Sequence, residues 1–217
     1  HDIIGRRAAD FSGGEKERPF MELQRRAFEV LKNTGTKCNA IWFWGDSLAP
    51  EFPKAEAGRC ALGETILMRG ITAAASIPIF PTEEAGRSFE AFLTEKADKA
   101  IAALNGGYER AYVHIQATDD LSHDRNPLGK RAAIETADAL VVRRLMNEVE
   151  GDFRLLVLSD HFTYSDTGSH GGDPVPCLYF DSTCPGNNPS ARFTEALCDE
   201  RYELTTAKGT VEMMEKK

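Results

Sequence analysis

The chain has 217 residues, of which 41% are hydrophobic and 28% are charged, and its formal net charge is −8. These proportions are ordinary for a globular protein, and the length allows one large core, or one core and part of a second domain. The negative charge argues against a nucleic-acid or membrane-surface partner, because such proteins usually present a basic face. No apolar run reaches the length of a membrane span.

The cysteines are odd in number and form no C-x-x-C pair: Cys38, Cys60, Cys177, Cys184 and Cys198. Neither a disulfide framework nor a cysteine-type zinc site is indicated. Reduced thiols are typical of the cytoplasm, so we expect a soluble cytoplasmic protein. We expect the thiols to be buried as small hydrophobic groups, that of Cys177 in particular because it lies in an apolar run.

The first fifty residues give few periodic signals apart from a helix over 20–31, in which apolar residues recur at helical spacing. The aromatic run over 39–45, which contains Trp42 and Trp44, predicts a strand that either packs in the core or lines a substrate cleft. Residues 48–53 contain two prolines and are typical of a connection. We therefore expect a boundary between two parts of the chain near residue 50.

The rest of the chain predicts strands over 59–63, 77–80, 110–117, 153–158 and 175–180, and helices over 64–75, 88–104 and 127–149. This order predicts an α/β fold with a mostly parallel sheet and helices on both faces. The apolar run over 153–158 predicts a central parallel strand that is buried on both faces. The helix over 127–149 carries the apolar stripe Ile134, Ala137, Val141 and Leu145, and a weaker helical pattern covers 210–217.

Carboxylates and imidazoles follow two of these strands. Asp119 and His123 are four residues apart, so a helical turn would place both on one face, where they could bind one cation. The alternative is an aspartate that caps the helix and an exposed histidine. Asp160 and His161 follow the run over 153–158 and point to different sides, as adjacent ligands of a two-metal centre do. The alternative is a polar strand end that faces solvent.

A third histidine, His170, lies in a glycine-rich loop that can fold back over the strand ends. Three of the five histidines thus gather beside aspartates at one predicted edge of the sheet. Carboxylate oxygens and imidazole nitrogens suit manganese, zinc or iron better than calcium. The sequence therefore predicts a metal site at the carboxyl ends of the strands. His114 lies inside a predicted strand and is expected to be a packed core residue.

Other polar residues have a simpler explanation as surface groups. Arg69, Arg87 and Arg110 could receive a phosphate, but an exposed arginine is more common. Asp124 and Asp166 could add carboxylates, and we expect them to be solvated loop residues.

Four segments carry a resemblance to a known family: Asn39–Gly45, Val113–His123, Ser159–His161 and Ser169–Pro176. In order and spacing they resemble the archaeal-type, cofactor-independent (2,3-bisphosphoglycerate-independent) phosphoglycerate mutases of the alkaline phosphatase superfamily. The resemblance implies a partial alkaline-phosphatase-like α/β core. It implies that Asp119, His123 and His170 hold one metal ion, and that Asp160 and His161 supply half of a second site. The cofactors would be two divalent ions, manganese first, with zinc, cobalt or iron as alternatives.

The resemblance also implies that part of the active site lies elsewhere. In this family an aspartate ligand and a serine or threonine nucleophile lie upstream of an inserted phosphotransferase domain, and no residue here matches that nucleophile motif. Residues 1–50 would be the tail of the inserted domain, and residues 51–217 the C-terminal part of the metal-binding phosphatase-like domain. The chain would then be the C-terminal portion of a longer mutase that acts on a small phosphorylated metabolite, and inactive alone.

Several positions depart from the family pattern without removing a ligand. Gln116 stands where a glutamate is usual, Thr118 replaces a common proline, Ser122 replaces a small residue, and Phe162 and Tyr164 stand where prolines are usual. Pocket residues are those that vary with substrate. Two alternatives therefore stay open: a phosphatase or phosphodiesterase of the same superfamily, and a non-catalytic binding module.

Overall fold

The computed structural model describes residues 18–43, 48, 51–82, 86–184, 186, 193–194 and 206–215. The chain divides into two compact units, His1–Phe52 and Pro53–Lys217. The division lies within the proline-containing connection over 48–53.

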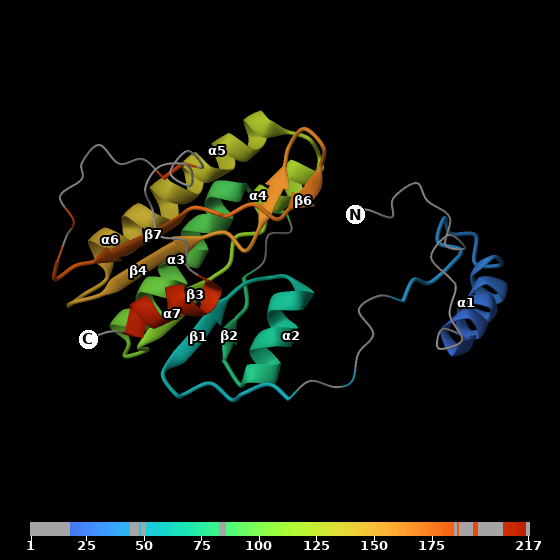
Figure 1. Cartoon of the computed structure of the whole chain (residues 1–217), viewed down its shortest axis with the longest axis horizontal. Helices are drawn as coiled ribbons and strands as arrows, with labels where there is room; N and C mark the ends of the chain where they lie inside the picture. Colours follow the sequence, from blue (N-terminus) through green and yellow to red (C-terminus); the bar gives the residue numbers. More distant parts are fainter. Residues whose placement is uncertain are drawn as a thin grey trace. The chain divides into compact units, whose positions relative to one another are not determined.

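The first unit is built on helix α1 (Arg18–Leu31), the blue helix of Figure 1. The side-chain amide of Gln24 donates a hydrogen bond to the carbonyl of Ile41 (3.1 Å), and the rings of Phe20 and Phe43 lie 5.2 Å apart. These contacts hold the following segment on the helix. Residues 39–43 form no strand, so the strand prediction is wrong over this range, while residues 44–45 lie outside the described residues. Trp42 is 36% exposed, so it is not a core residue.

The second unit contains a parallel sheet with strand order β2-β1-β3. Strand β1 (Arg59–Leu62) pairs in parallel with β2 (Ile79–Phe80) and with β3 (Arg110–Val113). Helix α2 (Ile66–Ala75) links β1 to β2, and α3 (Phe89–Asn105) links β2 to β3. The α/β architecture predicted from the sequence is confirmed.

The helix starts follow from their capping residues. The hydroxyl oxygen of Thr65 accepts a hydrogen bond from the backbone N–H of Met68, and that of Ser88 accepts one from Ala91. Each cap satisfies a backbone donor that has no partner inside the helix. The predicted helix over 88–104 is thereby confirmed to within one residue at each end.

Two antiparallel pairs complete the strands of this unit within the described residues. Strand β4 (Arg154–Leu158) pairs with β7 (Cys177–Asp181), and β5 (Phe162–Tyr164) pairs with β6 (Ser169–Gly171) as a hairpin. The prediction of a central parallel strand over 153–158 is therefore wrong, and β4 is only partly buried. A parallel return needs a crossover, usually a helix, whereas the chain between β4 and β7 forms the β5–β6 hairpin.

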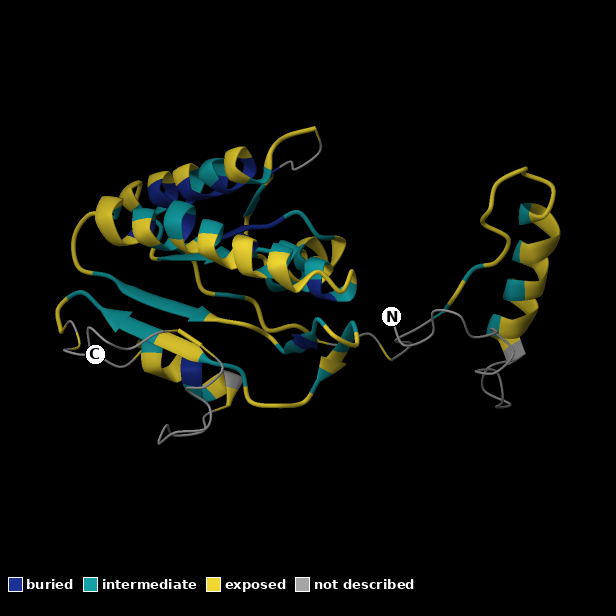
Figure 2. Ribbon diagram, turned by 90° about the horizontal axis from the view of Figure 1, so that it is seen from above, coloured by how far each residue is buried: buried dark blue, intermediate teal, exposed yellow. Residues whose placement is uncertain are grey.

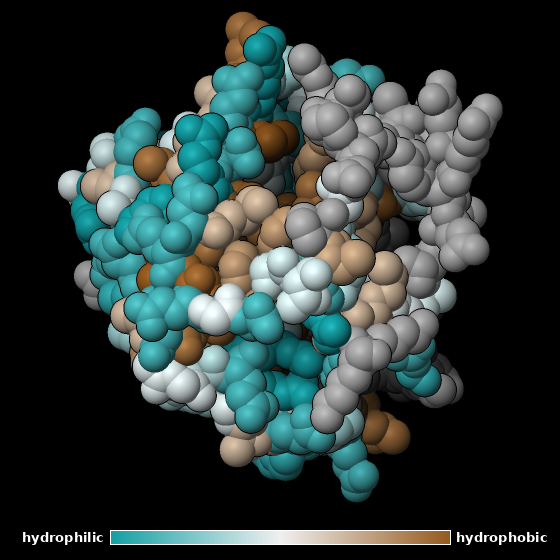
Figure 3. All heavy atoms as spheres, turned by 90° about the vertical axis from the view of Figure 1, so that its left-hand side faces the viewer, coloured by the Kyte–Doolittle hydropathy of each residue, from teal (hydrophilic) through white to brown (hydrophobic). Residues whose placement is uncertain are grey.

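Helices lie on both faces of the β4–β7 pair, in agreement with the predicted helices on both faces of the sheet. Figure 2 shows α3 and the run of α5 (Pro127–Ala137), the π-helix η3 (Asp138–Val142) and α6 (Arg143–Glu148) on one side of β4 and β7, and α7 (Ala207–Glu215) on the other. The buried core combines β1 with these helices: Leu62, Phe92, Leu93, Ala97, Ala100, Ile101, Val141 and Leu145. On the face seen in Figure 3, apolar side chains reach the surface between polar ones.

The predicted stripe over 127–149 is correct at Val141 and Leu145 but wrong at Ile134, which is 46% exposed. Ala133 is buried instead. The π-helical turn over 138–142 explains the shift, because a wider turn changes the phase of the residues that precede it.

Replacing Leu93 by alanine should lower the free energy of unfolding by about 2–5 kcal/mol, because a fully buried leucine leaves a cavity in this core. Urea unfolding measures the change. Leu67→Ala is the control: its side chain is 70% exposed, and the effect should stay within about 0.5 kcal/mol. Equal losses for the two variants would contradict the assignment of this core.

Stability should also depend on the Asp181 carboxylate at the end of β7. It accepts hydrogen bonds from the Thr183 hydroxyl (2.6 Å) and the Arg154 guanidinium (2.9 Å), which hold its pKa well below the usual range. Its stabilisation is full above the unfolded pKa of about 4 and is lost as the pH falls toward the folded pKa. The stability difference between wild type and Asp181→Asn, measured by urea unfolding, should therefore shrink below about pH 4. A stability difference that stays constant with pH would contradict this role of Asp181. Asp166→Asn, a change at an exposed residue, serves as the control.

Candidate metal centre

Helix α4 (Ala117–His123) begins just after β3 and carries the first two candidate ligands. Nε2 of His123 lies 3.4 Å from Oδ1 of Asp119, so the two residues lie on one face of the helix, as their spacing predicts. Gln116 precedes the helix, and its side-chain amide donates hydrogen bonds to Oδ2 of Asp119 (2.9 Å) and to Oδ1 of Asp120 (3.3 Å). Gln116 thereby holds Oδ2 of Asp119, while Oδ1 lies near His123.

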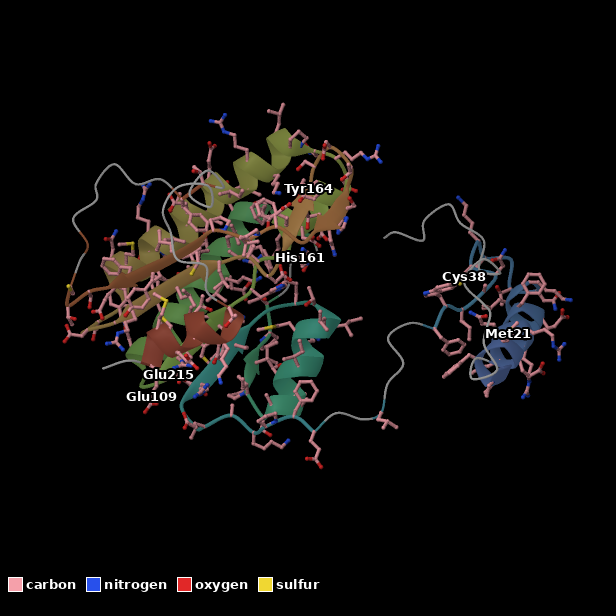
Figure 4. All side chains as sticks on the ribbon, viewed as in Figure 1. Met21, Cys38, Glu109, His161, Tyr164 and Glu215 are labelled. Atoms are coloured by element: carbon pink, nitrogen blue, oxygen red, sulfur yellow. The ribbon has the colours of Figure 1, made fainter. Side chains whose placement is uncertain are left out.

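The β5–β6 hairpin brings His161 and His170 to α4. Nε2 of His170 lies 3.0 Å from Nε2 of His123 and 3.6 Å from Oδ1 of Asp119. The rings of His161 and His170 have centroids 3.9 Å apart, and Asp119, His161 and His170 each offer a ligand atom within 4.8 Å of the others. His170 lies in β6 opposite Thr163, so its placement in a loop was wrong. Figure 4 shows His161 beside the hairpin, at the end of the unit opposite Glu109 and Glu215.

Asp160 lies at the solvent side of this cluster. Its side chain is 84% exposed, and its Oδ2 lies 3.3 Å from Nε2 of His161. Its other oxygen, Oδ1, accepts a hydrogen bond from the His161 backbone (3.0 Å). The family resemblance divides the five residues between two sites. The structure brings His161 next to Asp119 and His170, so any second position must share the space of the first.

Hydrogen bonds assign the protons of two imidazoles. Nδ1 of His123 lies 2.7 Å from the carbonyl oxygen of Gly168, which can only accept, so Nδ1 carries the hydrogen. Nδ1 of His161 lies 3.2 Å from the carbonyl oxygen of Phe162 and 3.2 Å from Oγ1 of Thr163. The Thr163 hydroxyl donates to Oδ1 of Asp119 (2.7 Å), so its oxygen accepts from His161. In their neutral forms both imidazoles therefore expose an Nε2 lone pair, as metal-binding histidines do.

The spacing of the donor atoms fits a divalent ion. Asp119 Oδ1, His123 Nε2 and His170 Nε2 lie 3.0–3.6 Å apart. An ion with ligand bonds of about 2.1 Å places neighbouring ligand atoms about 3.0–3.4 Å apart. A lone pair of His123 that faces Nε2 of His170 at 3.0 Å is stabilised by a proton or by a cation between them. Mixed nitrogen and oxygen donors suit manganese, zinc or iron.

Two further residues support the cluster and were missed as functional residues in the sequence. Thr163 is 5% exposed and contacts both Asp119 and His161. The sequence did contain a signal for Thr163: it lies two residues after His161 in an extended segment, where alternate side chains point to the same side. Gly168 has a φ of +70°, and a Cβ there would lie 3.0 Å from the carbonyl oxygen of His123. Glycine therefore lets the hairpin turn approach α4 closely enough for the His123 hydrogen bond.

The other candidates lie outside the cluster. Arg69 is exposed on α2, Arg87 pairs with Glu95, and Arg110 pairs with Glu215 (3.4 Å). Asp124 and Asp166 are exposed, as predicted. His114 is partly buried, and within the described residues its buried Nδ1 has no hydrogen-bond partner.

The prediction that the cysteines are buried is correct for Cys60 alone among the described ones. Burial raises the pKa of the Cys60 thiol. Cys38, Cys177 and Cys184 are exposed, and Cys198 lies outside the described residues. For Cys177 the reason is that it lies at the start of β7, paired with the exposed end of β4 at Leu158.

Comparison with known proteins assigns the family. A family model described as the metalloenzyme superfamily matches residues 54–211, which include every residue of the cluster. The chain belongs to the metalloenzyme superfamily. The resemblance read from the four sequence segments is thereby confirmed at the level of the family.

The relatives of this superfamily member include a 2,3-bisphosphoglycerate-independent phosphoglycerate mutase of Methanosarcina barkeri, 25% identical over 90% of this chain and 53% of the relative. A probable enzyme of the same name from Geobacter sulfurreducens is 29% identical over 90% of this chain and 53% of the relative. The solved structure of the PH0037 protein from Pyrococcus horikoshii shows the same fold, with a TM-score of 0.69 at 24% identity, over 85% of this chain and 52% of that chain.

The chain therefore spans about half the length of the relatives that it matches. Among the described residues, no helix is long and apolar enough to cross a membrane.

Removing a donor should weaken metal binding. His123→Ala and His170→Ala should each lower the affinity for Mn²⁺ by at least about tenfold, since even residues that only orient the ligands typically contribute ten- to hundredfold. Titration calorimetry on metal-free protein measures the affinity. Asp166→Asn, an exposed change in the turn of the same hairpin, is the matched control and should bind as the wild type does. Unchanged affinity in both histidine variants would contradict the site.

Proposed function

We propose that the protein to which this chain belongs is a metal-dependent phosphoglycerate mutase. It interconverts 3-phosphoglycerate and 2-phosphoglycerate through a phosphoserine intermediate. The observation that carries the proposal is the convergence of Asp119, His123, His161 and His170 from α4 and the β5–β6 hairpin. Relatives that carry the mutase name support this choice of reaction.

In this proposal Asp119, His123 and His170 hold one divalent ion, and Asp160 with His161 contributes to a second. Manganese is preferred, with zinc, cobalt or iron as alternatives. The ions supply the positive charge that stabilises a phosphoryl group in transfer. The chain's own residues orient the donors: Thr163 and Gln116 each hold one oxygen of Asp119, and the Gly168 carbonyl turns Nε2 of His123 toward His170.

The nucleophilic serine or threonine is proposed to come from another part of the protein, so this chain alone is inactive as a mutase. The chain's coverage of about half of its relatives supports this division. Residues 1–50 are then the tail of an inserted phosphotransferase domain, and residues 51–217 belong to the phosphatase-like domain. The substrate is a small phosphorylated metabolite, for which Arg69 is a candidate contact, and the protein is cytoplasmic, without nucleic-acid or membrane partners.

Gln116 favours a second candidate, a phosphatase or phosphodiesterase of the same superfamily. Its amide touches Asp119 directly, at a position where the mutases that this chain resembles carry a glutamate. A neutral amide leaves the centre with less negative charge than a carboxylate would. The balance of charge beside the metal then differs from that of a mutase, as a change of substrate would require.

One pair of assays on the full-length protein distinguishes these functions. A mutase isomerises 3-phosphoglycerate, detected through a coupled enolase reaction, and releases no phosphate. Because the ions stabilise the transition state by several kcal/mol, His123→Ala should lower the rate by about 10²–10⁴-fold. Asp166→Asn should not. Phosphate release without isomerisation supports the hydrolase instead, and metal binding without either activity indicates a non-catalytic module.

A further inference from the structure

One lysine of the second unit is fully buried. Lys96 lies on the sheet-facing side of α3, and its side chain is 0% exposed. Buried lysines are rare, because removal of an ammonium group from water is unfavourable unless other groups compensate for the lost hydration. The buried face of α3 is otherwise apolar, so the sequence pattern alone does not predict that a lysine lies on it.

The ammonium group of Lys96 joins two strand ends. Its Nζ lies 2.6 Å from Oε2 of Glu64, which follows β1, and it donates a hydrogen bond to the carbonyl oxygen of His114, which follows β3. The ring of Phe92 lies beneath it, with 4.3 Å between Nζ and the ring centroid. A single charged group therefore holds the exits of both parallel strands at the carboxyl edge of the sheet.

The exit of β3 leads directly to the metal centre. The β1–β3 pairing continues one residue beyond the strand, with a hydrogen bond from the His114 N–H to the Leu62 carbonyl (2.9 Å). Only Ile115 separates His114 from Gln116, whose amide holds Oδ2 of Asp119. Ile115 packs against the core. The position of the His114 carbonyl therefore sets where Gln116 and α4 begin.

We propose that Lys96 is a positioning residue of the metal centre, which acts by holding the His114 carbonyl so that Gln116 and Asp119 face the hairpin histidines. The inference rests on the proposed metal centre. It adds a residue of α3, outside the four segments that carry the family resemblance. Glu64 neutralises the buried charge, while the contact with His114 transmits the effect to α4.

The test is Co²⁺ and Mn²⁺ binding to the metal-free chain. Lys96→Met should weaken Mn²⁺ binding by about ten- to hundredfold, as loss of outer-shell partners does, and should change the visible absorption spectrum of bound Co²⁺. Glu64→Gln keeps the donor to His114 and should retain affinity within about threefold. Lys99→Met is the matched control: Lys99 lies one turn further along α3, donates to the Pro81 carbonyl (2.5 Å) and should have no effect.

Folding and positioning are separated by the double variant Lys96→Met/Glu64→Gln, which leaves no unpaired buried carboxylate. It should fold, by circular dichroism, yet show the same loss of affinity and the same spectral change as Lys96→Met. Wild-type affinity and an unchanged Co²⁺ spectrum in the folded double variant would overturn the role of Lys96. A wild-type chain that binds neither Mn²⁺ nor Co²⁺ would instead overturn the proposed metal centre, and this inference with it.

Discussion

The parallel pairing of β1 with β3 is the constraint on which the candidate site depends. Register places Leu62 opposite Val113, so both strands end at one edge, and the chain leaves that edge through Glu64 and His114. Lys96 connects the two exits from the helix that covers the sheet. The first turn of α4, with Asp119, then starts from a fixed point. A shift of either strand by one residue would move these exits and turn their side chains to the opposite face.

The hairpin β5–β6 supplies the other half of the cluster by a different mechanism. Its turn lies against the end of α4, where the Gly168 carbonyl accepts from His123, and Lys130 of α5 donates to the Thr163 carbonyl (3.0 Å). Thr163 then bridges Asp119 and His161. These bonds use the Nδ1 side of two imidazoles and leave the Nε2 side for a ligand. The same contacts therefore hold the hairpin in place and orient its donors.

The side chains that α4 and the β5–β6 hairpin bring together determine the chemistry that the chain offers. Three imidazoles and one carboxylate converge, while Asp160 stays at the solvent side. In the proposed function such a set would hold metal ions that bind and polarise a phosphoryl group, and the hydroxyl that contacts it, that of Thr163, is not available as a nucleophile. Thr163 is 5% exposed and its hydroxyl is committed to Asp119. In the proposed function the nucleophile comes from another part of the protein.

The sequence by itself determined the α/β class and the helices over 88–104 and 127–149, and it predicted which aspartate and histidine residues form the candidate metal centre. Local spacing is enough for these, because capping residues, helical stripes and the four-residue step from Asp119 to His123 act within one element. Only the tertiary structure decided the antiparallel return of β7, the hairpin that holds His170, and the contacts of Thr163 and Lys96. These features depend on contacts between segments that are distant in sequence. The buried ammonium group of Lys96, for example, is stabilised by the Glu64 carboxylate and the His114 carbonyl, which follow two different strands.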